Sequence, residues 1–184
     1  IENNRLGDKT KEGFYKKTKK DGKTEILTLD LETKEYRAKQ RASFPSLKQT
    51  KTMDDLGERV KFLFGAKDKA GEFYRSTFSA LFAYVSNRIP EIADDLYKID
   101  QAMRAGFGWE IGPFEYWDAV GLERGLKAMS DADKPAVWIA DMQAAGIASF
   151  YKTENGIRYY YHIESKSYKE IPGQENYIIL DNIR

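Results

Sequence analysis

The chain has 184 residues, 41% of them hydrophobic, with 30 basic and 29 acidic side chains, a net charge of +1 and no cysteine. The balanced charge argues against a nucleic-acid or charged-membrane surface. The lack of cysteine excludes disulfides and thiolate metal sites and favours a reducing, cytoplasmic compartment. No apolar run approaches the roughly 20 residues of a membrane span. Because the first residue is Ile1 rather than Met, we expect a piece of a longer chain.

Residues 1–53 are rich in Lys and Thr and predict a β-ribbon followed by a linker. In TEILTLDLETKEYR, apolar and polar side chains alternate, and Asp21-Gly22 precedes this stretch as a turn signal. The segment ASFPSLKQTK, around Pro45, is interpreted as the linker to the next part of the chain.

Residues 54–148 predict helices, because apolar residues recur at the spacing of one helix face. The successive stripes are Leu56, Val60, Leu63 and Phe64; then Phe73, Tyr74, Thr77, Leu81 and Val85; then Leu96, Ile99 and Met103; and then Phe114, Trp117 and Val120. Pro90 ends or kinks the second helix, and Gly106 is predicted to cap the third. Pro113 fits a first helical position. We expect Asp133 and Pro135 to open a last helix, which Gly146 closes.

Residues 149–184 predict strands again, with Asn155-Gly156 as a hairpin turn. They loosely repeat the first ribbon: Phe14-Tyr15-Lys16 matches Phe150-Tyr151-Lys152, Gly22 matches Gly156 after a short deletion, and Tyr36 matches Tyr168. One economical interpretation is that each ribbon closes a helical unit, and that the unit of the first ribbon lies upstream of Ile1. The fold class that we predict is mainly α (α+β), a bundle of about five to six helices flanked by short β-ribbons at both ends.

The stretch RAGFGWEIGPFEYWDAVG resembles a dinucleotide-binding fingerprint only superficially. Such a fingerprint has the spacing G-x-G-x-x-G, follows a strand and opens a helix. Here Gly112 comes one residue late after Gly106 and Gly108, a helix precedes them, and Trp109 stands where a pyrophosphate would approach. We therefore interpret the glycines as a helix end, a tight reversal and a helix start, and predict no cofactor-binding residue.

Glu110, Glu115 and Asp118 are candidates for a paired-carboxylate site, but solvated or helix-capping acids are the favoured interpretation. Nothing in the sequence marks one of them for a raised pKa. His162, the only histidine, lies in an alternating strand without a nucleophile beside it, so we predict no catalytic role for it. Metal-ligand spacings are missing too. The sequence thus predicts no catalytic and no metal residue.

The same stretch, extended to IDQAMRAGFGWEIGPFEYWDAVGLE, resembles the signature of the C-terminal helical domain of L-3-hydroxyacyl-CoA dehydrogenases, a domain of the 6-phosphogluconate-dehydrogenase-C-like kind. The matching residues are Asp100, Ala102, Met103, Gly106, Gly108, Gly112, Pro113, Phe114, Asp118 and Gly121. The resemblance covers 54–148. In addition, LGDKTKEGFY (6–15) resembles the tail that ends such a domain.

The resemblance implies a fragment of an NAD-dependent enzyme of fatty acid β-oxidation, with tandem helical copies in a multidomain protein. Residues 1–53 would then contain the tail of a preceding copy, 54–148 would be the helical domain, and 149–184 would be a ribbon whose NYIILDNIR leads into a downstream domain. The family's NAD-binding domain and its catalytic His-Glu pair precede the helical domain and are missing from this stretch. We therefore expect no cofactor in this fragment, although the full-length enzyme uses NAD.

The resemblance also implies partners, namely an acyl-CoA substrate and the NAD-binding domain of the parent chain. The family's active-site Asn would fall near Phe78, which is apolar, and Asn87 is available only if the alignment shifts; we read this copy as non-catalytic. Six large apolar residues exceed what a small bundle needs to bury and predict an interface, or self-association, with the GFGW-GPF loop at its edge: Phe78, Phe82, Tyr84, Tyr116, Trp138 and Met142. The alternative hypothesis is a non-enzymatic helical module that mediates protein–protein association.

Overall fold

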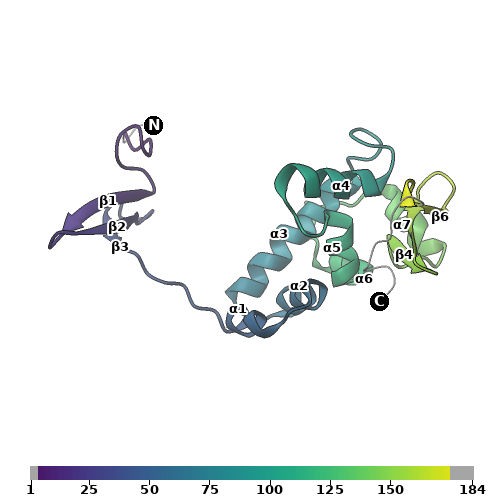
Figure 1. Ribbon diagram of the computed structural model, residues 1–184, viewed down its shortest axis with the longest axis horizontal. Helices are drawn as coiled ribbons and strands as arrows, with labels where there is room; N and C mark the ends of the chain where they lie inside the picture. The colour runs from purple at the N-terminus through teal and green to yellow at the C-terminus, as the bar shows by residue number, and fades with distance from the viewer. Residues whose placement is uncertain (1–3, 175–184) are drawn as a thin grey trace. The chain divides into compact units, whose positions relative to one another are not determined.

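The computed structural model describes residues 4–174 and divides into two compact units, 1–43 and 44–184 (Figure 1). The first unit is a small antiparallel sheet of strands β1 (Tyr15–Lys20), β2 (Lys23–Leu29) and β3 (Tyr36–Ala38), in that order. Asp21 and Gly22 both have positive φ, 50° and 75°, as the turn between β1 and β2 requires. The predicted first ribbon is therefore confirmed.

The second unit begins with helices and ends with another three-stranded sheet. Its helices are α1 (Pro45–Gln49), the 3-10 turn η1 (Thr50–Thr52), α2 (Leu56–Gly65), α3 (Lys69–Ser86), α4 (Leu96–Phe107), α5 (Pro113–Val120), α6 (Leu122–Ala128) and α7 (Val137–Ala144). Its strands are β4 (Tyr151–Glu154), β5 (Ile157–His162) and β6 (Ser167–Glu170), antiparallel in that order. The predicted fold class is confirmed.

Aspartates fix where the first long helices begin. The Asp55 carboxylate accepts the Glu58 N–H at 2.7 Å before α2, and the Asp68 carboxylate accepts the Gly71 N–H at 3.1 Å before α3. Asp68 also accepts hydrogen bonds from the backbone and hydroxyl of Ser46 in α1. One carboxylate thus starts α3 and ties α1 to it.

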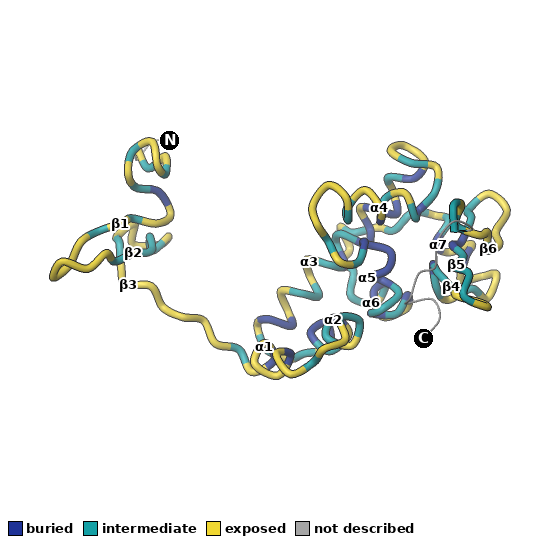
Figure 2. Tube along the Cα trace, in the orientation of Figure 1, coloured by how far each residue is buried: buried dark blue, intermediate teal, exposed yellow. Residues whose placement is uncertain are grey.

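The core lies where α3, α5, α7 and the second sheet meet, as the buried positions in Figure 2 show. Trp117 stacks on Phe82 at 4.9 Å between ring centroids, and Phe150 lies 5.1 Å from Phe114 and 5.0 Å from Trp117. Of the residues in the third and fourth predicted stripes, Leu96, Phe114 and Trp117 are fully buried. Ile99 is partly buried against the core, whereas Met103 is half-buried and lies outside it.

Several helix boundaries differ from the prediction. Helix α4 passes through Gly106 and ends at Gly108, which adopts the left-handed conformation (φ 66°, ψ 29°), so Gly108 rather than Gly106 is the cap. Helix α7 starts after Ala136 rather than at Asp133. The predicted linker contains the short helix α1, since Pro45 occupies a favourable first position, and α6 was not predicted. The NYIILDNIR segment lies outside the described residues.

We predict that Phe114→Ala lowers the free energy of unfolding of the helical unit by on the order of 3–5 kcal/mol, because the ring is fully buried among aromatic neighbours. Phe107→Ala is the matched control, since the Phe107 side chain is 75% exposed and its loss should change stability by less than about 0.5 kcal/mol. Urea unfolding followed by tryptophan fluorescence measures both. Equal effects of the two variants would contradict the described core.

Candidate functional site

The matched sequence motif forms the corner between α4 and α5, and its centre is Asp100. This buried carboxylate of α4 accepts the Phe114 N–H at 2.9 Å and the Glu115 N–H at 3.1 Å, so it caps the start of α5. The Tyr151 hydroxyl donates to the same carboxylate at 2.7 Å from the second sheet. Asp100 therefore joins two helices and the sheet at one point.

Gly112 permits this contact, because a Cβ atom there would lie 2.3 Å from the Asp100 Cβ and 2.4 Å from its Cα. Pro113 follows at the first position of α5, where no N–H is needed. Glu115 then turns back and accepts the Gly112 N–H at 2.6 Å. Its carboxylate also binds the guanidinium groups of Arg104 and Arg158, and it is largely buried. The interpretation of Glu115 as a capping acid is supported by these contacts.

Asp118 connects α5 to the second sheet, a role that the sequence did not predict. Its carboxylate accepts the Phe150 N–H at 2.8 Å and the Tyr151 N–H at 2.9 Å, so it receives the first amides of the second sheet. It is therefore neither solvated nor a cap of its own helix, contrary to the favoured interpretation. The sequence showed that Phe150-Tyr151 belongs to the repeated element, but no pattern in the sequence linked these two residues to Asp118.

Burial raises the pKa of the Asp100 carboxyl from its ordinary 3.8 to about 7, against the opposing hydrogen bonds from Phe114 and Tyr151. Burial likewise raises the pKa of Asp118 to about 7, against its two backbone N–H donors. The sequence did not mark Asp118 for a raised pKa, because the shift depends on burial that only the fold creates. Both pKa values are raised by burial, and the helix and sheet amides that bind each carboxylate only partly offset this effect.

The glycine run has the wrong geometry for a pyrophosphate. Gly106 lies inside α4, Gly108 ends it, and Gly121, with φ 98°, joins α5 to α6. A helix N-terminus binds a phosphate through free N–H groups and its positive dipole. At α5 those groups already bond to the carboxylates of Asp100 and Glu115, which would repel a further anion.

An open, mostly apolar hollow of about 240 Å³ lies beside this corner. It is lined by Leu56, Phe78, Gly108, Trp109, Glu110, Ile111 and Tyr116. The Phe78 and Tyr116 rings stack at 4.0 Å between centroids with an interplanar angle of 6°, and form the floor that connects α3 to α5. The loop 108–111 borders the hollow, and within it the Glu110 backbone carbonyl accepts a hydrogen bond from Arg104 at 3.2 Å.

Fewer of the six large apolar residues are left uncovered by the bundle than the sequence predicted. Phe82 and Met142 are fully buried, and Trp138 packs against the core and donates its indole N–H to the Ser86 carbonyl at 3.0 Å. Tyr84 is exposed beside Arg88. Of these six residues, Phe78 and Tyr116 line the hollow of about 240 Å³ together with Gly108 and Trp109 of the GFGW loop.

A larger hollow of about 510 Å³ lies between α2, α3 and α6. Arg75, Arg124 and Lys127 line it, together with Glu72. Arg75 donates to the carbonyls of Phe64 and Ala66, and Arg124 lies over the Phe64 ring. Arg75 thus binds the carbonyls at the end of α2, and Arg124 packs on an aromatic ring of the same helix.

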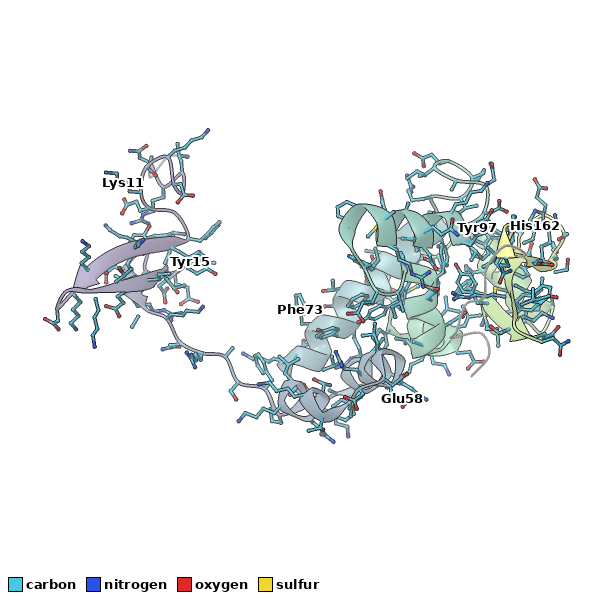
Figure 3. All side chains as sticks on the ribbon, in the orientation of Figure 1. Lys11, Tyr15, Glu58, Phe73, Tyr97 and His162 are labelled. Atoms are coloured by element: carbon cyan, nitrogen blue, oxygen red, sulfur yellow. The ribbon has the colours of Figure 1, made fainter. Side chains whose placement is uncertain are left out.

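The remaining candidate residues lie apart from the corner. The Asn87 amide donates to the Ala83 carbonyl at 2.9 Å and the Lys134 carbonyl at 2.8 Å, so it fastens the end of α3. His162, labelled in Figure 3, contacts the Ser165 hydroxyl at 2.9 Å through Nδ1 and Lys169 at 3.1 Å through Nε2. Among residues 4–174, no group of three or more histidines and carboxylates could hold a metal ion, and no helix is long and apolar enough to cross a membrane.

Comparisons with known proteins agree with the motif. Residues 78–159 match the family model of the 3-hydroxyacyl-CoA dehydrogenase C-terminal domain. The chain is 39% identical to a probable 3-hydroxyacyl-CoA dehydrogenase of Bacillus subtilis (strain 168), over 88% of this chain and 20% of that protein. It is 26% identical to a putative fatty acid oxidation complex trifunctional enzyme of Rickettsia prowazekii (strain Madrid E), over 62% of this chain and 14% of that protein.

A putative fatty acid oxidation complex trifunctional enzyme of Rickettsia felis (strain ATCC VR-1525 / URRWXCal2) is 24% identical over 99% of this chain and 22% of its own length. The chain therefore spans between 14% and 22% of the lengths of these curated relatives. No solved structure matches the chain.

We predict that the free energy of unfolding of the helical unit falls as the pH rises from about 5 to about 7, by about 1 kcal/mol per pH unit for each of Asp100 and Asp118. Their pKa values are raised from 3.8 to about 7 in the folded state, so in this window the folded protein still holds protons that the unfolded chain has already released. Asp118→Asn should flatten the slope. Urea unfolding at several pH values tests this, and a stability that increases with pH across the window would contradict it.

Proposed function

We propose, because residues 78–159 match the family model of the 3-hydroxyacyl-CoA dehydrogenase C-terminal domain, that the chain is the helical part of an NAD-dependent L-3-hydroxyacyl-CoA dehydrogenase of fatty acid β-oxidation. In this proposal the helical unit forms one wall of the acyl-CoA cleft and takes the place of a dimer partner. The NAD-binding domain and the reacting groups lie in other parts of a multidomain, cytoplasmic protein.

The observation that carries the proposal is the apolar hollow beside the family motif. Its floor is the stacked pair of Phe78 and Tyr116, and its border is the loop 108–111. The floor is fixed from below, because Tyr116 lies in the helix that Asp100 caps and Phe78 packs in the helix that carries the core residue Phe82. A rigid apolar wall suits a cleft that must hold a substrate in one orientation.

The groups within this chain support a positioning role rather than a chemical one. Asn87 fastens a helix end, and the amides at the start of α5 are bonded to Asp100 and Glu115. These contacts favour an NAD site outside the matched motif. The alternative, a non-enzymatic interaction module, is not favoured by the family match.

We predict that Phe78→Lys in the full-length protein lowers kcat/KM for 3-hydroxyacyl-CoA oxidation at least about tenfold, because a cation in the floor of the hollow misplaces the cleft wall. Tyr84→Lys is the matched control, since it lies on the same helix but is 58% exposed and away from the hollow. NADH formation gives the rates, and circular dichroism verifies that both variants fold. Unchanged kcat/KM in a folded Phe78→Lys variant would overturn the proposal.

A second prediction concerns the chain of 184 residues by itself. We expect no heat of NAD binding in calorimetry and no NADH production from 3-hydroxybutyryl-CoA, because its helix N-terminus at Pro113 already binds two carboxylates. Tight NAD binding by this chain would contradict the assignment of the cofactor to another domain.

A further inference from the structure

The hollow of about 510 Å³ between α2, α3 and α6 gathers charged side chains at one place (Figure 1). Arg75, Arg124 and Lys127 line it together with one carboxylate, that of Glu72. Three cations and one carboxylate leave an excess of two positive charges here, whereas the whole chain has a net charge of +1. The hollow is therefore locally electropositive in a chain of balanced charge.

Arg75, on α3, is held in one orientation by the end of α2. Its Nη1 atom donates to the Phe64 carbonyl at 3.1 Å and also to the Ala66 carbonyl. These carbonyls lie at the C-terminal end of the helix, where backbone acceptors lack partners within the helix itself. Within residues 4–174, the Nη2 and Nε atoms of Arg75 have no acceptor, and the side chain forms no ion pair. A fixed guanidinium therefore retains free N–H donors beside the hollow.

Arg124, on α6, is placed by packing against the same helix end. Its guanidinium lies over the Phe64 ring, 5.8 Å from the centroid, and its Nη1 atom donates to the Lys61 carbonyl at a long 3.4 Å. Its Nη2 atom lies against Gly65, where a Cβ atom would be only 2.2 Å away. Gly65 is the last residue of α2 and does not have the positive φ that would require a glycine. Gly65 thus provides room for a guanidinium that, in the described part of the chain, pairs with no carboxylate.

We propose that this hollow binds a phosphomonoester, the terminal dianionic phosphate of a small molecule, through Arg75, Arg124 and Lys127. Guanidinium N–H groups match phosphate oxygens in a bidentate geometry, and two guanidinium groups that are already fixed lose little freedom on binding. Lys127 adds a third cation. Its ammonium lies 3.4 Å from the Glu123 carboxylate, but the two side chains are 79% and 75% exposed, so this ion pair is weak and leaves the ammonium available.

Charge and size favour the monoester over other anions. A terminal phosphate carries close to two negative charges at neutral pH and offers three acceptor oxygens, whereas a phosphodiester or a carboxylate carries a single charge. Two charges balance the excess at the hollow, and three oxygens suit its three cationic groups. The group has two possible sources, inorganic phosphate and the terminal phosphate of a nucleotide such as the 3′-phosphate of coenzyme A. The site stands independently of the dehydrogenase assignment.

The direct test is calorimetric titration of the natural full-length protein with inorganic phosphate. Arg124→Gln should weaken one phosphate site at least about tenfold, because it removes charge-assisted hydrogen bonds. Lys61→Gln is the matched control: its side chain is on α2, 55% exposed and outside the hollow, and its loss should change the affinity less than about twofold. Methyl phosphate should bind at the same site at least about tenfold more tightly than dimethyl phosphate. Equal effects of the two variants, equal binding of the two esters, or no phosphate binding would overturn the proposal.

Gly65→Ala separates a binding role of Arg124 from a purely structural one. The variant keeps every charge, but its Cβ atom displaces the Nη2 atom at the end of a flexible side chain. Alanine suits a helix better than glycine, so the thermal unfolding midpoint should stay or rise, while phosphate affinity should fall at least about threefold. An unchanged affinity in this variant would mean that the position of the guanidinium serves packing alone, and the proposal would fail.

Coenzyme A and dephospho-coenzyme A, which differ only in the 3′-phosphate, identify the source. If the ligand is the nucleotide, Arg124→Gln should reduce the number of coenzyme A molecules bound per chain by one and leave dephospho-coenzyme A binding unchanged. If it is free phosphate, neither number should change although the phosphate site is lost. A loss of dephospho-coenzyme A binding would assign Arg124 to another part of the nucleotide and contradict the proposal. No readout uses dehydrogenase activity, so this site and the proposed function can fail separately.

Discussion

At the α4–α5 corner, the backbone of Gly112 approaches Asp100 so closely that no side chain fits between them. This approach places one carboxylate within reach of two α5 amides and of the Tyr151 hydroxyl. The orientation of α5 then follows, and with it the positions of Phe114 and Trp117 in the core and of Tyr116 in the floor of the hollow. The hydrogen bonds of Asp100 therefore position both the apolar core and the candidate site.

Burying carboxylates has a cost that their partners offset. Each helix or sheet amide left without an acceptor in this corner would cost about 1–3 kcal/mol, and Asp100 and Asp118 together receive four such amides and one hydroxyl. Desolvation of the carboxylates opposes this gain and appears as their raised pKa. Asp100 and Asp118 therefore contribute more to the geometry of the corner than to its stability. An apolar side chain in place of either carboxylate could not bind backbone amides at the start of α5 and of β4 in a defined direction.

The sequence predicted most of what local chemistry controls. Helical periodicity, the proline at the start of α5 and the Asp-Gly and Asn-Gly turns correctly predicted helices α2, α3, α4, α5 and α7 and both ribbons. It misplaced the end of α4, since Gly106 and Gly108 are both acceptable caps and only the chain reversal selects the left-handed Gly108. Helix α6 was missed because it is short and follows α5 directly, with Gly121 as the one residue between the two helices.

The role of Asp118 could not be predicted, because its partners are backbone amides 32 and 33 residues further along the chain. The hollow was anticipated only in part. Phe78 and Tyr116 were among the six apolar candidates, but spacing alone could not show that Phe82 and Met142 are covered by other elements. Residue identity indicated which side chains matter, and tertiary packing decided which of them remain accessible.

The central claim, that Asp100 couples the helices to the second sheet, is tested most directly by a double-mutant cycle between Asp100→Ala and Tyr151→Phe. The account predicts a coupling energy in the unfolding free energy of about 1 kcal/mol or more, because the two side chains share a hydrogen bond of 2.7 Å. A parallel cycle with Tyr168→Phe, whose hydroxyl donates to the Ser149 carbonyl, should give a coupling near zero. Additive effects of Asp100→Ala and Tyr151→Phe would contradict the account.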